Sequence, residues 1–337
     1  MSSLDRTYSL LLTLVSIVVC LAGFELVIRA LDDGMDFNIE QWKYAREVKR
    51  VADDPDLGHQ HLPNISTRLM GVDFRTNSKG LRDRELSYER DGSAVRIMML
   101  GDSLTLGWGA RAEDTFSKRI ERMFADRQMP TEVMNTGVGN YNTVMEVRYF
   151  QLEGYKYRPD IIVLNHFVND AEPVPSYSKN EFLKTLNCYT CVVTMGAIDN
   201  LLRMMGQRPQ WVEYYNGLYA EQSPTWARAK SSIEDLAKYC RANGIKLVIA
   251  ALPELHNPRA YQFQRITDRV RSVAGQEHVG FIDLLPYLQQ EEPEKLWVSA
   301  PDPHPNARAH QLIADGLFTK LWPLVLASAN ARAQQPK

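Results

Sequence analysis

The feature that most constrains this chain is the run from Val95 to Leu100, which stops abruptly at Gly101-Asp102-Ser103-Leu104. Six residues ending in three bulky apolar side chains predict a strand buried on both faces of a parallel sheet. The small and polar residues after it predict a turn at the edge where open α/β sheets carry their chemistry. Ser103 lies at this turn, ahead of a predicted helix over 113–127, and is a candidate nucleophile. An ordinary strand-to-helix turn is the alternative, because Gly, Asp and Ser favour turns.

A serine nucleophile needs a base, a group that orients the base, and hydrogen-bond donors for the developing oxyanion. Near the C-terminus, Asp302-Pro303-His304 supplies a histidine with an aspartate two residues before it, just ahead of a predicted helix. The apolar run 161–164 ends in a polar segment that contains Asn169, and the run 133–134 ends in the segment 135–143. Three strand ends and one late loop are therefore expected to meet on one rim of the sheet.

These four short blocks resemble the SGNH, or GDSL-type, serine hydrolase family, in which they supply serine, glycine, asparagine and histidine in that order. The resemblance covers roughly residues 93–322 and implies a three-layer α/β/α flavodoxin-like fold with a central parallel sheet. It also implies an esterase that needs no metal and no organic cofactor. Carried over by position, the resemblance makes Ser103 the nucleophile and His304 the base, with Asp302 orienting the base. The backbone N–H of Ser103 and the side-chain amide of Asn169 would stabilise the oxyanion.

Three positions depart from the family's usual pattern. The second block ends at Asn140, preceded by Gly139, where the family usually has a glycine, so either backbone N–H is a candidate oxyanion donor. Phe167 replaces the glycine of the third block and makes the wall beside the asparagine bulkier. Only Pro303 separates the aspartate from the histidine, instead of two residues. This shorter spacing resembles some polysaccharide O-acetyltransferases of the wider superfamily.

Three other histidines compete for the role of base, namely His166, His256 and His310. We favour His304, because it alone combines a neighbouring aspartate with the terminal position of the last block. His166, which lies close to the asparagine block, is predicted to contact substrate together with Phe167 and Asp102. No cluster of metal ligands accompanies His59 and His61, which are predicted to be surface residues.

The N-terminal segment carries no charge from Thr7 to Phe24 and stays largely apolar as far as Leu31. About 20 such residues suffice to cross a bilayer, so we predict an uncleaved, single-pass membrane anchor over residues 1–31. A cleaved signal peptide and a buried helix are the alternatives, although no small-x-small cleavage site follows the apolar core. Glu25 and Arg29 lie four residues apart and are expected to pair.

Charge and family resemblance predict opposite orientations for this anchor. Lysines and arginines beyond the helix favour a cytoplasmic body by the positive-inside rule, but large domains translocate largely regardless of charge. The resemblance points the other way, because anchored members of the superfamily commonly act on exported glycans. We therefore predict a periplasmic or extracellular catalytic domain.

The rest of the chain divides into a lead-in, a catalytic domain and a tail. Residues 32–94 are predicted to be an irregular or short-stranded lead-in, residues 95–328 the hydrolase domain, and residues 329–337 a disordered tail. Alternating strands and helices predict the parallel sheet. The predicted strands are 95–100, 133–135, 161–164, 245–251 and 279–284, and the predicted helices are 113–127, 224–242 and 306–327. An insertion over 171–223 interrupts this rhythm and should lie over the active site.

Within the insertion, Cys188 and Cys191 are three residues apart, which leaves open buried free thiols, a local disulfide, or a redox or metal role. The whole chain has 39 basic and 41 acidic side chains, hence a net charge of 39 − 41 = −2, and lacks a basic block. Nucleic acid is therefore not an expected partner. The sequence leaves the oligomeric state open.

These features together predict a membrane-anchored serine esterase that removes small acyl groups, acetyl above all. The expected substrate is an acylated polysaccharide of the cell envelope or a secreted one, an expectation that rests on the anchor. A polysaccharide O-acetyltransferase that forms the same acyl-enzyme is the first alternative. A non-catalytic envelope scaffold that kept the fold is the second.

Overall fold

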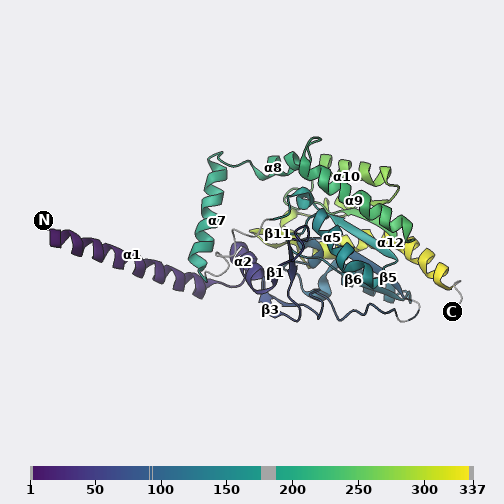
Figure 1. Cartoon of the computed structure of the whole chain (residues 1–337), viewed down its shortest axis with the longest axis horizontal. Helices are drawn as coiled ribbons and strands as arrows, with labels where there is room; N and C mark the ends of the chain where they lie inside the picture. Colours follow the sequence, from purple (N-terminus) through teal and green to yellow (C-terminus); the bar gives the residue numbers. More distant parts are fainter. Residues whose placement is uncertain (1–2, 91, 93, 176–186, 334–337) are drawn as a thin grey trace.

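The computed structural model describes residues 3–90, 92, 94–175 and 187–333, and it is built around a five-stranded parallel sheet (Figure 1). The strands lie in the order β6-β5-β7-β8-β9, and every neighbouring pair is parallel. Their bounds are β5 Val95–Leu100, β6 Thr131–Asn135, β7 Ile161–His166, β8 Lys246–Ala251 and β9 Gly280–Asp283. The predicted α/β fold with a central parallel sheet is confirmed.

Helices cover both faces of the sheet, because the side chains of each strand alternate between its two faces. Ile97 and Met99 of β5 pack with α4 (Phe116–Ala125) and α12 (Ala307–Ala333). Met98 and Leu100 pack on the other face with α5 (Thr143–Leu152), α9 (Pro224–Ala242) and α10 (Gln264–Gln276). All six residues of β5 are buried, as a strand between two helical layers requires.

The predicted helices differ from the observed ones mainly at their ends. The predicted helix 224–242 coincides with α9, which Ser223 caps by accepting the N–H of Trp226. α4 begins later than predicted, because a 3₁₀ turn occupies Ala112–Asp114. α12 runs on to Ala333, so residues 329–333 are helical and not part of a disordered tail. The last four residues of the predicted tail lie outside the described residues.

The lead-in contains a helix that the sequence did not predict. α2 (Phe37–Glu47) begins after Asp36, whose carboxylate accepts the N–H of Ile39. Two antiparallel hairpins follow, and they pair β1 (Lys49–Val51) with β2 (His59–His61), and β3 (Ser66–Leu69) with β4 (Val72–Arg75). His59 and His61 are only 1% and 5% exposed, so the prediction that they are surface residues is wrong.

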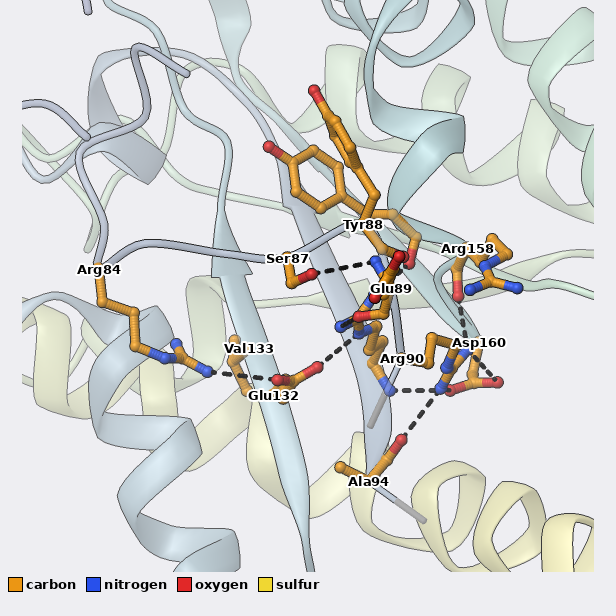
Figure 2. Close-up of polar contacts among 12 residues, drawn as sticks. Arg84, Ser87, Tyr88, Glu89, Arg90, Ala94, Glu132, Val133, Arg158 and Asp160 are labelled. Carbon is orange, nitrogen blue, oxygen red and sulfur yellow. Dashed lines mark hydrogen bonds and ion pairs between the residues drawn. The ribbon is translucent and has the colours of Figure 1, made fainter. Parts of the chain in front are cut away.

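The last residues of the lead-in contact residues at the N-terminal ends of the sheet strands (Figure 2). Arg90 donates to the carboxylate of Asp160, just before β7, at 2.7 Å, and to the carbonyl of Ala94, just before β5, at 3.0 Å. Arg84 lies 4.0 Å from the carboxylate of Glu132 on β6. These contacts therefore leave the C-terminal ends of the strands free.

Two helices stand apart from the layers. α1 (Ser3–Leu31) projects from the body (Figure 1) and is long and apolar enough to cross a membrane, with no part of its apolar window buried. α7 (Tyr189–Met204) starts near the end of α1 and leads to α8 (Trp211–Leu218). Cys188 and Cys191 form a disulfide at the start of α7, which selects one of the three predicted alternatives. α12 also passes the length and hydropathy test, but it is partly buried in the core.

The remaining elements are short. They are α3 Ser103–Leu106, the 3₁₀ helices Gly154–Tyr157, Val168–Ala171 and Pro293–Lys295, α11 Leu285–Leu288, and the pair of antiparallel strands β10 Trp297–Ser299 and β11 Asp302–Pro305.

Candidate active site

Two neighbouring side chains near the C-terminus and a serine 201 positions before the second of them form one chain of hydrogen bonds where β5 ends. Ser103 is the first residue of α3, directly after β5, and its Oγ lies 2.9 Å from Nε2 of His304. Nδ1 of the same imidazole lies 2.5 Å from Oδ1 of Asp302. Because a carboxylate only accepts, Nδ1 carries the proton, and Nε2 is free to accept the hydroxyl proton of the serine. Asp302 and His304 are two residues apart on β11, so their side chains point to the same side of the strand and can bond to each other.

The carboxylate of Asp302 is held by further donors. The backbone N–H of His304 donates to Oδ1 at 3.1 Å, and the indole Nε1–H of Trp108 donates to Oδ2 at 3.0 Å. Burial by itself would raise the pKa of Asp302, but the hydrogen bonds from His304 and Trp108 outweigh it and lower the pKa below its usual value. The group that faces the imidazole is therefore an ionised carboxylate at neutral pH.

Asp102 holds the asparagine of the third block in place. One of its oxygens accepts the N–H of Leu104 at 2.9 Å and caps α3, and the other accepts Nδ2–H of Asn169 at 3.0 Å. The second N–H of the same amide is then left for the cavity, which Asn169 lines. Asp102 itself is fully buried and does not line the cavity, so its predicted contact with substrate is replaced by a positioning contact.

Gly139 and Asn140, the two candidate backbone donors, differ in what already binds each N–H. The N–H of Gly139 donates to Oη of Tyr44 at 2.8 Å, and its carbonyl is 2.9 Å from Nε2 of His59. Asn140 has a φ of 65°, lines the cavity, and within the described residues its N–H has no partner. Asparagine tolerates this left-handed conformation better than most residues. The N–H of Asn140 is thus the one available to an oxyanion.

A cavity of 680 Å³ opens beside Ser103 and His304. Phe37 of α2 lines it and stacks on the imidazole of His304, with ring centroids 6.1 Å apart. Phe167 lines it too, as predicted for a bulky residue beside Asn169. The insertion contributes Glu172, Asn200, Arg203, Gln210, Trp211, Tyr214 and Tyr215 to the lining.

The sequence blocks and this geometry agree with a comparison against known families. A family model described as the GDSL-like Lipase/Acylhydrolase family matches residues 99–312, which is more than half of the chain and includes all four blocks. The chain belongs to this family. As a GDSL-like acylhydrolase, it is an enzyme that hydrolyses ester bonds.

Solved structures of GDSL-like and related enzymes resemble this chain at low identity. The psychrotrophic esterase EstA from Pseudoalteromonas sp. matches with 14% identity and a TM-score of 0.45, over 68% of this chain and 98% of its own. A lipase/acylhydrolase from Enterococcus faecalis matches with 13% identity and a TM-score of 0.44, over 68% and 96%. An acetyl xylan esterase matches with 13% identity and a TM-score of 0.44, over 67% and 100%. No curated protein matches the chain in sequence.

The other histidines of this GDSL-like enzyme make different contacts. His166 is 3% exposed, its Nε2 lies 2.9 Å from Oη of Tyr219, and burial lowers its pKa to about 3. It does not line the cavity, so the prediction that it contacts substrate is wrong. His310 is buried in the core, where Nδ1 accepts the N–H of Phe116 at 3.2 Å. His256 lines the cavity, but its ring bonds to Glu254 and not to the serine.

Three residues that support the GDSL-like site were missed by sequence reasoning. The position of Trp108, close after the serine block, indicated that it lies near the site. Nothing in the sequence showed whether its indole donates a hydrogen bond there or only packs in the core. Phe37 and Tyr44 lie in the lead-in, outside every block of the family. Within the described residues, no group of three or more His, Cys, Asp or Glu side chains is arranged to hold a metal.

Proposed function

We propose that the enzyme is a serine esterase in which Ser103 is the nucleophile, His304 the general base and Asp302 the group that orients it. The observation that carries this proposal is the unbroken chain of hydrogen bonds from the serine Oγ through both imidazole nitrogens to the carboxylate. Each contact has the geometry expected for nucleophile, base and orienting group.

In the first half of the reaction, Oγ of Ser103 attacks the ester carbonyl carbon while its proton passes to Nε2 of His304. The carbonyl oxygen then carries the negative charge of a tetrahedral intermediate. When the bond to the alcohol breaks, His304 gives the proton to the leaving oxygen, and an acyl-serine remains. Water repeats the sequence in the second half, and it releases the acid and restores the serine.

Three donors would stabilise the oxyanion: the backbone N–H of Ser103, the backbone N–H of Asn140, and the second amide N–H of Asn169. Two of them are tied in place before substrate binds. The amide of Asn169 is fixed by Asp102, and the turn at Asn140 is fixed through Gly139. Donors that are held in advance stabilise developing charge without reorganising during the reaction.

The proposed substrate is a small acyl ester, such as an acetyl ester, on a glycan of the cell envelope or on a secreted polysaccharide. We propose that α1 anchors the enzyme in a membrane and that the catalytic domain lies outside the cytoplasm. The Cys188–Cys191 disulfide supports this placement, since disulfides persist in oxidising compartments.

Acyl transfer to a sugar hydroxyl is a second candidate, and two observations favour it. Phe37 stacks on the catalytic imidazole, and the side chains of α7 and α8 form a wall of the cavity. Both restrict the access of water to the acyl-enzyme, and a cleft that excludes water favours an alcohol acceptor. We favour hydrolysis, because nothing in the described cavity identifies a separate donor site.

The first experiment tests the serine mechanism. Purified full-length enzyme is assayed on a small aryl acetate beside Ser103→Ala, with Ser231→Ala on the exposed surface of α9 as the matched control. We expect Ser103→Ala to lose nearly all turnover and the control to keep it. An unchanged rate in Ser103→Ala would reject the mechanism.

The second experiment separates hydrolysis from transfer. The enzyme receives an acyl donor with and without an oligosaccharide acceptor, and mass spectrometry follows the acyl group. Free acid should exceed acylated oligosaccharide. The opposite ratio would make the enzyme an O-acyltransferase.

A further inference from the structure

α7 presents an apolar face that nothing covers within the described residues. Ile198 and Leu201 are 51% and 54% exposed, and Met204 and Met205 at the end of the helix are 83% and 62% exposed. Met195 is 52% exposed too, but it lies on another side of the helix, where it lines a hollow together with Trp42 of α2. No residue of α7 is buried. Single exposed apolar residues are ordinary, but these four, three on α7 and one directly after it, form a patch of the kind that marks an interaction surface.

The face of α7 that is turned toward the body has a different character. Gly196 packs against Asn38 of α2, so closely that a Cβ there would meet the asparagine amide at 2.9 Å. Asn200 and Arg203 line the catalytic cavity. Leu201 lies on the opposite side of the helix from Gly196 and Arg203, because successive residues are spaced at 3.6 per turn. α7 is therefore a wall with the cavity on its inner side and the apolar face on its outer side.

The start of α7 is fixed to the end of α1. The carboxylate of Glu25 accepts the N–H of Tyr189 at 3.0 Å and the N–H of Thr190 at 2.7 Å, which caps the helix. Arg29 pairs with Glu25, as predicted from their spacing, and its guanidinium lies 4.3 Å from the centroid of the Tyr189 ring. α7 thus begins where α1 ends.

α7 runs across the direction of α1. Figure 1 shows α7 rising steeply from the end of α1, across the direction of that helix, with α2 and the body on the side away from α1. A helix that runs across a membrane-spanning helix at its end lies along the membrane surface. An apolar face on such a helix is suited to the boundary between lipid headgroups and acyl chains.

We propose that α7 is a surface-lying membrane helix whose apolar face, Ile198, Leu201, Met204 and Met205, is embedded in the bilayer that α1 crosses. This inference rests on the membrane placement of α1 proposed above. Lipid is favoured over a protein partner because α7 starts at the end of α1, whose apolar window is exposed throughout, and runs across the direction of that helix. Since α7 is also a wall of the cavity, the proposal brings the catalytic cavity to the lipid surface, within reach of acyl groups on membrane-bound molecules.

The test measures the depth of α7 in lipid with full-length enzyme and without using catalysis. Ile198→Cys is introduced into a Cys20→Ser background, in which the remaining free thiol, Cys240, is buried. The new thiol receives an environment-sensitive fluorophore, and the protein is reconstituted into phosphatidylcholine vesicles with and without brominated acyl chains. Leu326→Cys is the matched control, since it is an exposed leucine near the end of α12, which lies at the far end of the molecule from α1. Leu14→Cys reports whether α1 is inserted.

Brominated lipid should quench the labels at Ile198 and Leu14 at least several-fold more than the label at Leu326. Quenching at Leu14 without quenching at Ile198 would overturn the proposal and leave a protein partner as the occupant of the face. Absence of quenching at Leu14 would remove the membrane placement of α1 and the proposal with it. A loss of esterase activity would change none of these readings, so failure of the proposed function is distinguishable.

Discussion

At the scale of single residues, the imidazole of His304 is fixed on both nitrogens and on one ring face. Asp302 binds Nδ1, Ser103 binds Nε2, and Phe37 stacks against the ring. Asp302 is itself fixed by Trp108. The proposed base is therefore oriented before substrate arrives, and rotation of its ring would break these contacts.

This arrangement predicts unequal effects when the base and its orienting group are changed. His304→Ala should lower kcat by about 10³-fold, because a positioned general base contributes roughly 10²–10⁴. Asp302→Asn should lower kcat less, since the aspartate orients the histidine and stabilises its charge but moves no proton itself. Steady-state kinetics on an aryl acetate, with circular dichroism to check folding, decide the point. Full activity in His304→Ala would transfer the role to another group.

His61 should make stability depend on pH, because burial lowers its pKa from 6.5 to about 3. Between these values the unfolded chain binds more protons than the folded one, so the free energy of unfolding falls as the pH drops below 6.5. The slope from one such histidine is about 1.4 kcal/mol per pH unit. Urea unfolding in detergent at pH 4, 5 and 6 should therefore show a shallower slope for His61→Gln. The exposed His278→Gln controls for the substitution, and equal slopes in His61→Gln and the wild type would contradict the prediction.

At the scale of elements, the lead-in acts on the site through the loop between β6 and α5. Oη of Tyr44 on α2 accepts the N–H of Gly139 and lies 2.6 Å from Nε2 of His61 on β2. His59 of the same strand bonds the carbonyl of Gly139. Two elements of the lead-in thus hold the peptide units next to Asn140, the proposed oxyanion donor.

Tyr44→Phe should therefore impair catalysis while the fold persists. Loss of the hydroxyl leaves the N–H of Gly139 buried without its partner, which costs about 1–3 kcal/mol, and it releases the turn that carries Asn140. We expect kcat to fall about tenfold, with little change in KM. Tyr149→Phe is the control, since within the described residues its buried hydroxyl has no partner. Equal kcat in the two variants would reject this role for the lead-in.

The same elements show which parts of the molecule the sequence could predict. β5 and α9 were predictable with their bounds, because β5 is an apolar run that stops at Gly101 and α9 has a helical period and its own end signals, such as Ser223 and Asn243. The serine, asparagine and histidine blocks were predictable because the polar residues directly follow apolar strands or precede the last helix. The role of Tyr44 was not predictable, because it depends on a hydrogen bond with Gly139, 95 positions away. No local pattern records such a contact.

At the scale of the whole molecule, a single helix carries the chain away from the body. α1 is exposed along its length, and everything after Leu31 lies on one side of the membrane if α1 alone spans it. The alternative span, α12, packs on the sheet through Ile313 and Leu317 and is needed there. The proposed topology therefore has one crossing and an exported body.

A reporter fused after Lys337 tests this topology. An alkaline phosphatase fusion should be active, because that enzyme needs an oxidising compartment for its disulfides, and a fluorescent protein that folds only in the cytoplasm should stay dark. Fusions to Ser2 provide the reciprocal control. The reverse pattern would place the body in the cytoplasm and remove exported glycans as substrates.

The cap that Glu25 provides links the proposed anchor to a wall of the cavity. A protease that cut between Leu31 and Asp36 would release the body from its membrane, and it would also remove the carboxylate that binds the first N–H groups of α7. The released enzyme would keep Ser103 and His304, yet the helix that carries Arg203 would start without its carboxylate cap. We therefore expect release from the membrane to change the substrate selectivity of the enzyme as well as its location.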